Sequence, residues 1–381
     1  MKKLSLNNFK LAVIVLAWIC TGLKVSAQEN RLQRADSLIE KRMQRADSIV
    51  AESAQRLDSV IRQRIKKTPK AHRLLKMDSL IAKRYYKTHS DTAYYIRPLT
   101  KLTLTGRLNI SGAVVEMEGN EQGIPFHSKM TSDYKSTLSM GVSYLGITLN
   151  LALNPAKLLG KYKDFELNLN SYSNKWGFDF IYQNAHNFTG WYEGDGSPRI
   201  SLPSSTLKLE SLNINTYYAF NHRRFSYPAA FSQTYIQRRS AGSFLVGVSG
   251  QGQRAKTNGA YESILKVTNI GIGAGYGYNW VPKRNWLLHL SALPTFTVFS
   301  HSSLTVKKGE EDSDNKVSER IPIDYRFPEV IIAARGAIVR QIGNMFAGVT
   351  MVYNFTNIGD RDELAIHNSK WRARLFLGYR L

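Results

Sequence analysis

Histidines are the first candidates for chemistry, because histidine serves both as a general base and as a metal ligand. The chain holds eight, and no two form a His-x-x-x-His pair that would place two imidazoles on one helix face. His289 falls on a predicted inward strand face, and His301 is followed by Ser302 and Ser303. Neither histidine has a recognisable acid partner or a nucleophile elbow near it in the sequence. We therefore predict no enzyme, cofactor or metal site, with a membrane hydrolase as the weakest alternative.

A glycine-rich run at residues 271–277 (Gly-Ile-Gly-Ala-Gly-Tyr-Gly) is the second such feature. A loop that cradles phosphate needs glycines at its first, third and sixth positions, and the sixth position here is Tyr276. The glycines instead recur at every second residue, which places them on one face of a strand. The run thus predicts a smooth inner wall or a tight bend of a barrel.

The end of the chain indicates what kind of sheet carries these residues. From Trp371 to Leu381, apolar residues alternate with Arg372, Arg374 and Arg380 up to the last position. A strand of about 9–11 tilted residues with this pattern is typical of outer-membrane β-barrels. About twelve alternating segments follow Leu102, joined by short turns and long loops in alternation. The predicted fold is all-β, a closed antiparallel transmembrane barrel of about twelve strands. The long outward loops are expected at 117–133, 155–162, 184–205, 251–267, 300–327 and 357–369.

If the apolar stripes face lipid, a set of ionisable side chains points into the barrel. These predicted lumen-lining residues are Arg107, Glu166, Asp179, His289, Arg335, Arg372, Arg374 and Arg380. Their excess of arginine over carboxylate predicts a positive inner wall. A charge network that fills the lumen and a passage for anions or another solute both fit this wall. The long outer loops could instead form a receptor or adhesin surface.

The start of the chain has the features of a secretory signal peptide. Lys2, Lys3 and Lys10 accompany an apolar run, and residues 25–27 (Val-Ser-Ala) precede the expected cleavage point. Cleavage after residue 27 would also remove Cys20, the one cysteine of the chain. An exported protein seldom meets nucleic acid, so the net charge of +23 indicates anionic lipid or cell-wall polymer as the counter-charge. The predicted location is the outer membrane of a Gram-negative cell.

Residues 28–89 follow a helical period instead. Asp36, Asp47 and Asp58 recur every eleven residues in similar units, and eleven residues make about three helical turns. Residues 28–99 contain 17 basic and 8 acidic side chains. We predict a basic α-helical periplasmic segment in front of the barrel at 90–381. It is a solvated spacer, a coiled-coil contact with a periplasmic protein or with another copy of the chain, or a basic stripe on membrane or polymer.

One inward turn, residues 222–240, departs from the pattern because it is long. Its predicted inward or plugging residues are Phe225, Ser226, Tyr227, Phe231 and Gln237. The run 222–231 (His-Arg-Arg-Phe-Ser-Tyr-Pro-Ala-Ala-Phe), with Gln237 and 240–243 (Ser-Ala-Gly-Ser), resembles the domain of unknown function 4421 family of Bacteroidota. Residues 91–96 (Asp-Thr-Ala-Tyr-Tyr-Ile) and 190–192 (Gly-Trp-Tyr) fit the same family. The resemblance covers about residues 90–381. It implies an outer-membrane-like barrel, with no assigned activity and no site residues to carry over.

These patterns favour a structural or scaffolding outer-membrane barrel whose basic helices, residues 28–86, contact a periplasmic partner. A narrow anion-preferring channel or solute transporter is the second hypothesis. Outer-membrane lipid is the expected surrounding, and no nucleic-acid partner is expected.

Overall fold

The computed structural model describes residues 76–77, 79–83, 90–121, 123–144, 147–153, 165–186, 188–194, 198–204, 206–257, 262–308, 317–323, 329–360 and 364–381. All of these belong to one unit of the chain, Thr68–Leu381. The signal peptide predicted at 1–27 lies outside the described residues. Of the helical segment predicted at 28–89, only 76–77 and 79–83 are described, and these are helical. Within the described ranges, no helix is long and apolar enough to cross a membrane.

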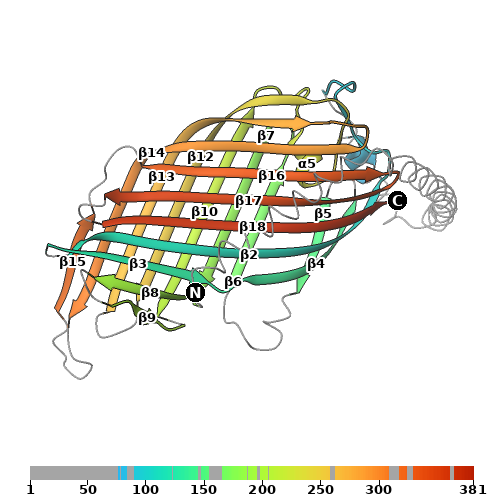
Figure 1. The fold of residues 1–381 in the computed structure, drawn as a ribbon. Helices are drawn as coiled ribbons and strands as arrows, with labels where there is room; N and C mark the ends of the chain where they lie inside the picture. Colours follow the sequence, from blue (N-terminus) through green and yellow to red (C-terminus); the bar gives the residue numbers. More distant parts are fainter. Residues whose placement is uncertain are drawn as a thin grey trace, which may run out of the picture. The chain divides into compact units, whose positions relative to one another are not determined.

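The predicted all-β class is confirmed, because most of the described chain is strand and helices are few (Figure 1). The strands are β1 (Tyr95–Ile96), β2 (Leu102–Glu121), β3 (Ile124–Ser132), β4 (Lys135–Tyr144), β5 (Ile147–Leu153), β6 (Phe165–Tyr172), β7 (Trp176–Ala185), β8 (Phe188–Gly194), β9 (Ile200–Leu202), β10 (Leu207–Ala219), β11 (Ile236–Gln237), β12 (Ala241–Thr257), β13 (Glu262–Trp280), β14 (Trp286–Lys308), β15 (Val317–Ile323), β16 (Val330–Ile342), β17 (Met345–Asp360) and β18 (Leu364–Arg380). A short helix, α5 (Tyr227–Phe231), lies between β10 and β11.

Sixteen of the strands form one antiparallel sheet, and β1 pairs separately with β11. The central order of the large sheet is β7-β10-β12-β13-β14-β16-β17-β18-β2. The terminal strand β18 pairs with the first long strand, β2, from Arg380 opposite Thr103 to Leu364 opposite Gly119. Beyond it, β2 pairs with β4 near its start and with β3 near its end.

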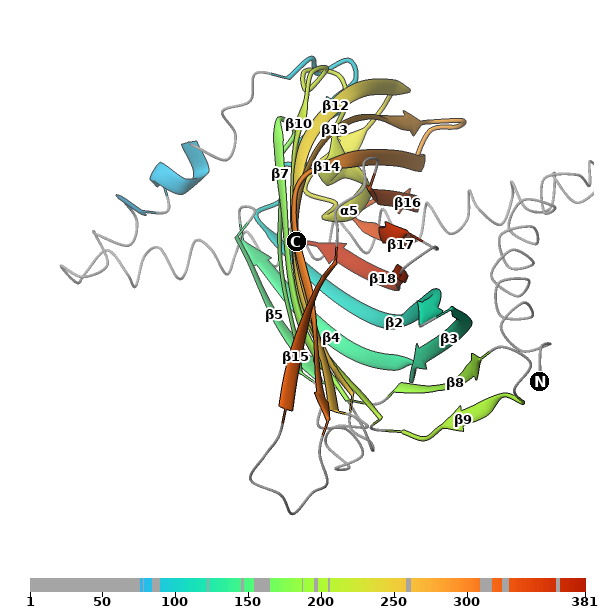
Figure 2. The ribbon, with the colours of Figure 1, turned by 90° about the vertical axis from the view of Figure 1, so that its left-hand side faces the viewer.

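The two sides of this sheet approach each other at one end. There β3 pairs with β8, which begins three residues after β7 ends, so that Ser132 lies opposite Phe188. At the other end β5 pairs with β4 and β6 pairs with β7, and neither has a second partner among the described strands. The result is a curled antiparallel sheet, seen along its curvature in Figure 2. Closure all the way round, with about twelve strands, stays a prediction.

The strands are much longer than the alternating segments predicted. β14 has 23 residues, β2 has 20 and β13 has 19. Most of the outward loops expected near 117–133, 251–267 and 300–327 are therefore strand, and this part of the prediction is wrong. The apolar alternation ends before the strands do, because antiparallel pairing depends on backbone groups and not on side-chain polarity.

The glycine run of β13 lies where the backbone of neighbouring β14 comes very close. A Cβ atom on Gly273 would lie 2.0 Å from the carbonyl oxygen of Pro294, and one on Gly275 would lie 2.0 Å from that of Ala292. Neighbouring β14 therefore approaches the β13 backbone too closely for any side chain. The glycines permit this close approach, whereas the smooth wall or tight bend that their period-two spacing predicts stays a prediction.

Candidate functional site: a plugged and layered interior

The plug segment, residues 222–240, folds onto the inner face of the curled sheet. All five residues of its helix α5 are buried. The helix contacts β6, β14 and β16, and it lies on the concave side of the sheet in Figure 2. Ser226 caps it, since its Oγ accepts a hydrogen bond from the Ala229 N–H (3.3 Å), and Pro228 occupies the first turn, where proline is favoured.

Gln237 and Asn279 fix the plug segment to the wall. The Gln237 side chain donates to the carbonyl oxygens of Arg224 (2.7 Å) and Arg239 (3.0 Å). Its Oε1 accepts hydrogen bonds from the Ser226 N–H (3.2 Å) and from Asn279 Nδ2 (3.0 Å). Asn279 Nδ2 also donates to the Ser226 carbonyl oxygen at 2.9 Å. One buried glutamine thus holds both ends of the segment and joins them to β13.

Residues 90–97 form a clasp on the plug segment. β1 pairs with β11, and the Asp91 N–H donates to the Arg223 carbonyl oxygen at 2.9 Å. The Tyr95 hydroxyl donates to the His222 carbonyl oxygen at 2.7 Å. Burial raises the pKa of this hydroxyl, so it remains a donor. Arg224 and Asp91 add an ion pair at 3.6 Å. The chain leading to β2 is therefore bound to the plug segment before it enters the sheet.

His289 joins a chain of neutral hydrogen bonds beneath the plug segment. Its Nδ1 lies 2.6 Å from Asn279 Oδ1, and its Nε2 lies 2.9 Å from Ser291 Oγ. Because Oδ1 can only accept, Nδ1 carries the proton and Nε2 accepts from the Ser291 hydroxyl. Ser291 accepts in turn from the Tyr227 hydroxyl at 2.7 Å. These donor and acceptor directions match those of a serine nucleophile (Ser291) with its histidine general base (His289), although Tyr227 covers Ser291.

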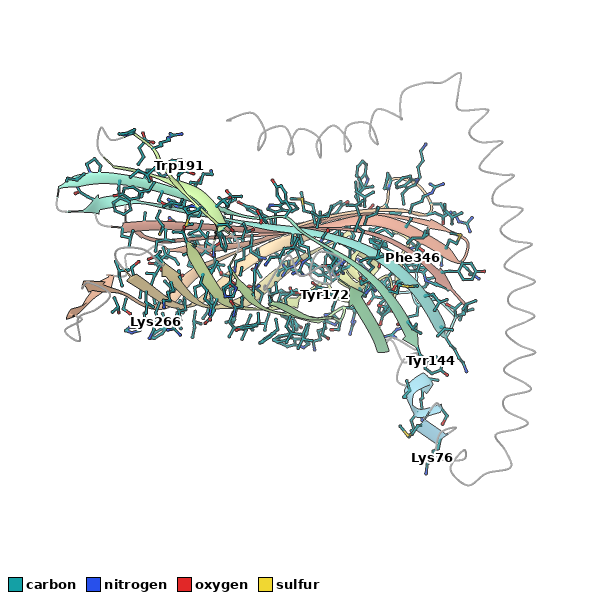
Figure 3. The ribbon with its side chains drawn as sticks, turned by 90° about the horizontal axis from the view of Figure 1, so that it is seen from below. Lys76, Tyr144, Tyr172, Trp191, Lys266 and Phe346 are labelled. Atoms are coloured by element: carbon teal, nitrogen blue, oxygen red, sulfur yellow. The ribbon has the colours of Figure 1, made fainter. Side chains whose placement is uncertain are left out.

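Arg335 and Asp179 form a buried ion pair between strands that are not neighbours in the sheet. Arg335 Nη2 lies 2.6 Å from Asp179 Oδ2, and the Tyr172 hydroxyl donates to Asp179 Oδ1 at 2.5 Å. Two further contacts join distant strands in the same way, from Lys370 Nζ to Ser211 Oγ (2.5 Å) and from Thr356 Oγ1 to Gln251 Oε1 (3.0 Å). Side chains thus connect a first wall (β7, β10, β12) with a second wall (β16, β17, β18) across the interior. Figure 3 shows this filling, with Tyr172 near the middle of the view and Trp191 at one end.

The three arginines of the terminal strand β18 have different surroundings. Arg380 donates to Gln341 Oε1 (2.6 Å) and to the Gln233 carbonyl oxygen (3.0 Å), so β18 also holds the plug segment. Arg374 Nε donates to Asn109 Oδ1 at 2.7 Å. Arg372 lines a small cavity of about 40 Å³ that is partly open to solvent. Arg107 lines a second cavity, near Arg380 and Gln233.

The interior is layered in the same order along several strands. An apolar plug cluster that includes Phe225, Tyr227, Phe231, Phe346 and Phe376 occupies one end. A distal cluster occupies the other end, formed by Ala113, Val115, Met130, Ala185, Phe188, Leu207, Leu209, Val267, Ile358 and Ile366. Between them lie the Arg335–Asp179 pair and the cavity beside Arg372. Along β18, for example, Ile366, Arg372 and Phe376 belong to successive layers. The Arg335–Asp179 pair and the cavity beside Arg372 thus lie between two apolar clusters, whereas Arg380 lies beyond the plug cluster.

The structure brings most of the predicted inward residues together. Asp179, His289, Arg335 and Arg380 are buried, as are the predicted plug residues Phe225, Ser226, Tyr227, Phe231 and Gln237. Glu166 pairs with Gln183 through the backbone, and its side chain lies outside the described part of the structure. Their role as lumen lining stays a prediction, as does the plug itself.

Sequence reasoning missed several partners of these residues. Asn279 and Ser291 lie at inward positions of their strands, as His289 does. The period-two alternation could therefore have predicted that they face the interior. Lys135 and Lys370 lie just outside the predicted strand limits, which were too short. Across the described ranges, no group of three or more His, Cys, Asp or Glu side chains is arranged to hold a metal ion.

The described chain is a curled antiparallel sheet, with the plug segment and several arginine side chains on its concave side. The chain belongs to the family described as "Domain of unknown function (DUF4421)", whose model matches residues 89–381. The predicted family membership is thereby confirmed. No curated protein sequence matches the chain significantly.

Solved structures that show some similarity to this chain include three bacterial outer-membrane proteins. The outer membrane protease OmpT from Escherichia coli has 7% identity and a TM-score of 0.41, over 74% of this chain and 97% of that one. The translocator domain of the autotransporter NalP from Neisseria meningitidis has 11% identity and a TM-score of 0.25, over 82% and 96%. The outer membrane protein OprG from Pseudomonas aeruginosa has 8% identity and a TM-score of 0.26, over 74% and 97%. At these values none of them assigns an activity or a residue role to this chain.

Proposed function

We propose that this protein is a structural outer-membrane β-barrel with a filled interior, whose N-terminal basic helices contact a periplasmic partner. The observation that carries the proposal is the buried plug segment, bound to the sheet through Gln237, Asn279 and Arg380. Cross-wall contacts and two apolar clusters occupy the remaining interior. A solute pore needs a continuous polar path, which this order of layers opposes.

An apolar band on the outer face supports placement in a membrane. Leu104, Leu108, Leu375 and Leu377 are among its exposed residues, and they occupy paired strands. Exposed Trp176 and Trp280 mark one edge, and Tyr134 packs near Trp371 at the other, with ring centroids 5.8 Å apart. Aromatic rows at both edges are typical of the bilayer interfaces. Between Trp371 and Leu381 the span matches the roughly 9–11 residues that a tilted crossing strand needs.

Beyond this band the outer face becomes charged while the strands continue. Glu116 pairs with Lys129, and His367 Nε2 lies 3.0 Å from Glu118 Oε1. We infer that these strand ends project into water. In the membrane, we infer that β5 and β6 pair and complete a ring of about twelve strand runs, because unpaired backbone groups are costly in lipid.

The clasp supports the scaffolding part of the proposal. Residues 28–86 connect to the barrel through 90–97, which the plug segment holds by β pairing and hydrogen bonds. A partner bound to the basic helices would therefore hold the barrel at a defined point on its rim.

Deletion of residues 28–86 tests the scaffold. The barrel should still insert, because its contacts lie within the retained chain, and cross-linking to a periplasmic partner should be lost. Replacing Arg34, Arg45 and Arg56 by glutamine should weaken the cross-link, while Ser37, Ser48 and Ser59 to alanine serve as the neutral control. A cross-link that persists after the deletion contradicts the proposal.

An anion-preferring channel is the second candidate, and the basic cavity beside Arg372 favours it. A channel predicts conductance in a planar bilayer that falls when Arg372 and Arg374 are both replaced by alanine. The structural proposal predicts a silent, correctly folded barrel.

A membrane hydrolase is the third candidate, favoured by the Ser291–His289–Asn279 geometry. It predicts that a fluorophosphonate probe labels Ser291, and that Ser291→Ala abolishes the label. The structural proposal predicts no label while Tyr227 covers the serine.

A further inference from the structure

The turns at one end of the sheet carry a concentration of positive charge. They are residues 90–101, 173–175, 220–240 and 281–285, which lead into β2, β7, β12 and β14. Together these segments contain nine Lys or Arg residues and one acidic residue, Asp91. Asp91 is paired with Arg224 at 3.6 Å. Six other cations are exposed, and we call them the basic rim: Lys175, Arg223, Arg238, Arg239, Lys283 and Arg284.

Hydrogen bonds hold the turns of the basic rim beside one another. The Ala219 N–H donates to the Lys175 carbonyl oxygen at 2.9 Å, which joins the turn before β7 to the end of β10. The Val281 N–H donates to Ser240 Oγ at 2.9 Å, which joins the plug segment to the turn after β13. The basic rim is therefore one surface along the neighbouring ends of β7, β10, β12 and β13.

Aromatic side chains place this surface at the level of lipid headgroups. Exposed Trp176 and Trp280 mark the adjoining edge of the apolar band, with exposed Phe220 at the same edge. Lys175 directly precedes Trp176, and Lys283 follows Trp280 by three residues. Each residue extends the chain by at most about 3.6 Å, so both cations lie within roughly 11 Å of a tryptophan. The headgroup layer is about 5–8 Å deep, and long cationic side chains reach into it.

We propose that the basic rim binds the headgroups of anionic phospholipids in the adjoining leaflet. The inference rests on the proposed function in one respect, that the apolar band crosses a membrane. A lipid surface fits this rim because the cations continue an aromatic edge of the kind found at bilayer interfaces. Grouped Lys and Arg beside a membrane attract anionic lipid, and each cation adds to the attraction. Because Arg223, Arg238 and Arg239 belong to the plug segment, bound lipid would also hold that segment at the rim.

The other end of the strands has a different charge pattern. There Lys129 is paired with Glu116, and Arg199 Nε lies 2.5 Å from Glu193 Oε2. A cation with a carboxylate beside it exerts a weaker attraction on an anionic surface, because the two charges oppose each other. Lys129 and Arg199 therefore provide a matched control for the exposed cations of the basic rim.

The test uses the full-length protein inserted into nanodiscs of phosphatidylcholine with a minority of phosphatidylglycerol, which carries one negative charge. Native mass spectrometry measures the enrichment of phosphatidylglycerol among the lipids that stay bound. Enrichment is expected, and it should fall between about 0.1 M and 1 M salt, because the Debye length shrinks from about 10 Å to about 3 Å. An inserted, heat-modifiable barrel without this enrichment overturns the inference and leaves the proposed function intact. A protein that cannot be inserted contradicts both.

Paired variants locate the binding. Lys283→Gln with Arg284→Gln should lower the enrichment by about fivefold or more. Lys129→Gln with Arg199→Gln removes one lysine and one arginine from paired positions and should change the enrichment by less than about twofold. Lys283→Arg with Arg284→Lys keeps both charges and should leave the enrichment unchanged, which separates the loss of charge from a disturbed turn.

Two results would overturn the assignment of this surface to lipid. One is equal enrichment in the wild type and in the first pair of variants. The other is binding of soluble polyglutamate to the protein in pure phosphatidylcholine nanodiscs, without enrichment of phosphatidylglycerol in the mixed ones. That second result would assign the basic rim to an acidic polymer.

Discussion

Asp179 and Arg335 show at the scale of single residues how the interior is held together. The pair is almost fully buried, with side-chain exposures of 6% and 2%, and Tyr172 satisfies the second carboxylate oxygen. A buried pair of this kind contributes modestly to stability as a whole, because desolvation offsets its attraction. Losing one partner is different, since the remaining charge stays buried without compensation.

Arg335→Met should therefore lower the free energy of unfolding by about 3–5 kcal/mol. Adding Asp179→Asn should recover about 1–3 kcal/mol of that loss, because the two sites are coupled. Urea unfolding of the refolded protein in lipid vesicles measures both values. The control is Arg199→Met, which breaks an Arg–Glu193 pair with exposures of 49% and 40% and should cost at most about 1 kcal/mol. Equal losses at Arg335 and Arg199 would show that the buried pair does not organise the interior.

At the scale of elements, the close approach of the β13 and β14 backbones depends on glycine. Gly275→Ala should destabilise the barrel by about 1–3 kcal/mol, because the added methyl group meets the Ala292 carbonyl oxygen and cannot be accommodated by a side-chain shift. Gly106→Ala is the control, since no described atom lies within 4 Å of its Cβ position, and it should change stability by less than about 0.5 kcal/mol. The same unfolding assay compares them. A harmless Gly275→Ala would mean that the two backbones do not need to come this close.

Some features of the strands can be predicted from the sequence, and others cannot. Period-two alternation predicts the all-β class and the inward parity of Arg335 and Asp179, both of which are buried. It does not predict how far the strands extend, because Glu116, Glu118 and His367 pair through their backbones without an apolar pattern. It places Asn279 and Ser291 on the inward face with His289, but it does not predict the Asn279–His289 contact, since that contact depends on the register between β13 and β14. The plug segment is predictable as an unusually long turn, whereas its contacts with Asn279 and Arg380 depend on tertiary packing.

At the scale of the whole molecule, the protein combines an apolar band on its outer face with an interior that holds an apolar cluster at each end. A soluble protein seldom exposes an apolar band of this extent, because such surface associates in water. The band, its aromatic edges and the charged strand ends beyond it are all explained if the sheet crosses a membrane.

Membrane fractionation combined with a heat-modifiability gel is the most direct test of whether the protein is an outer-membrane β-barrel. The full-length protein, expressed in a Gram-negative cell, should fractionate with the outer membrane and require detergent for extraction. Its unheated band should migrate faster than its boiled band, because a barrel stays folded in detergent. A protein that is soluble and monomeric without detergent, with one band under both conditions, would contradict the account.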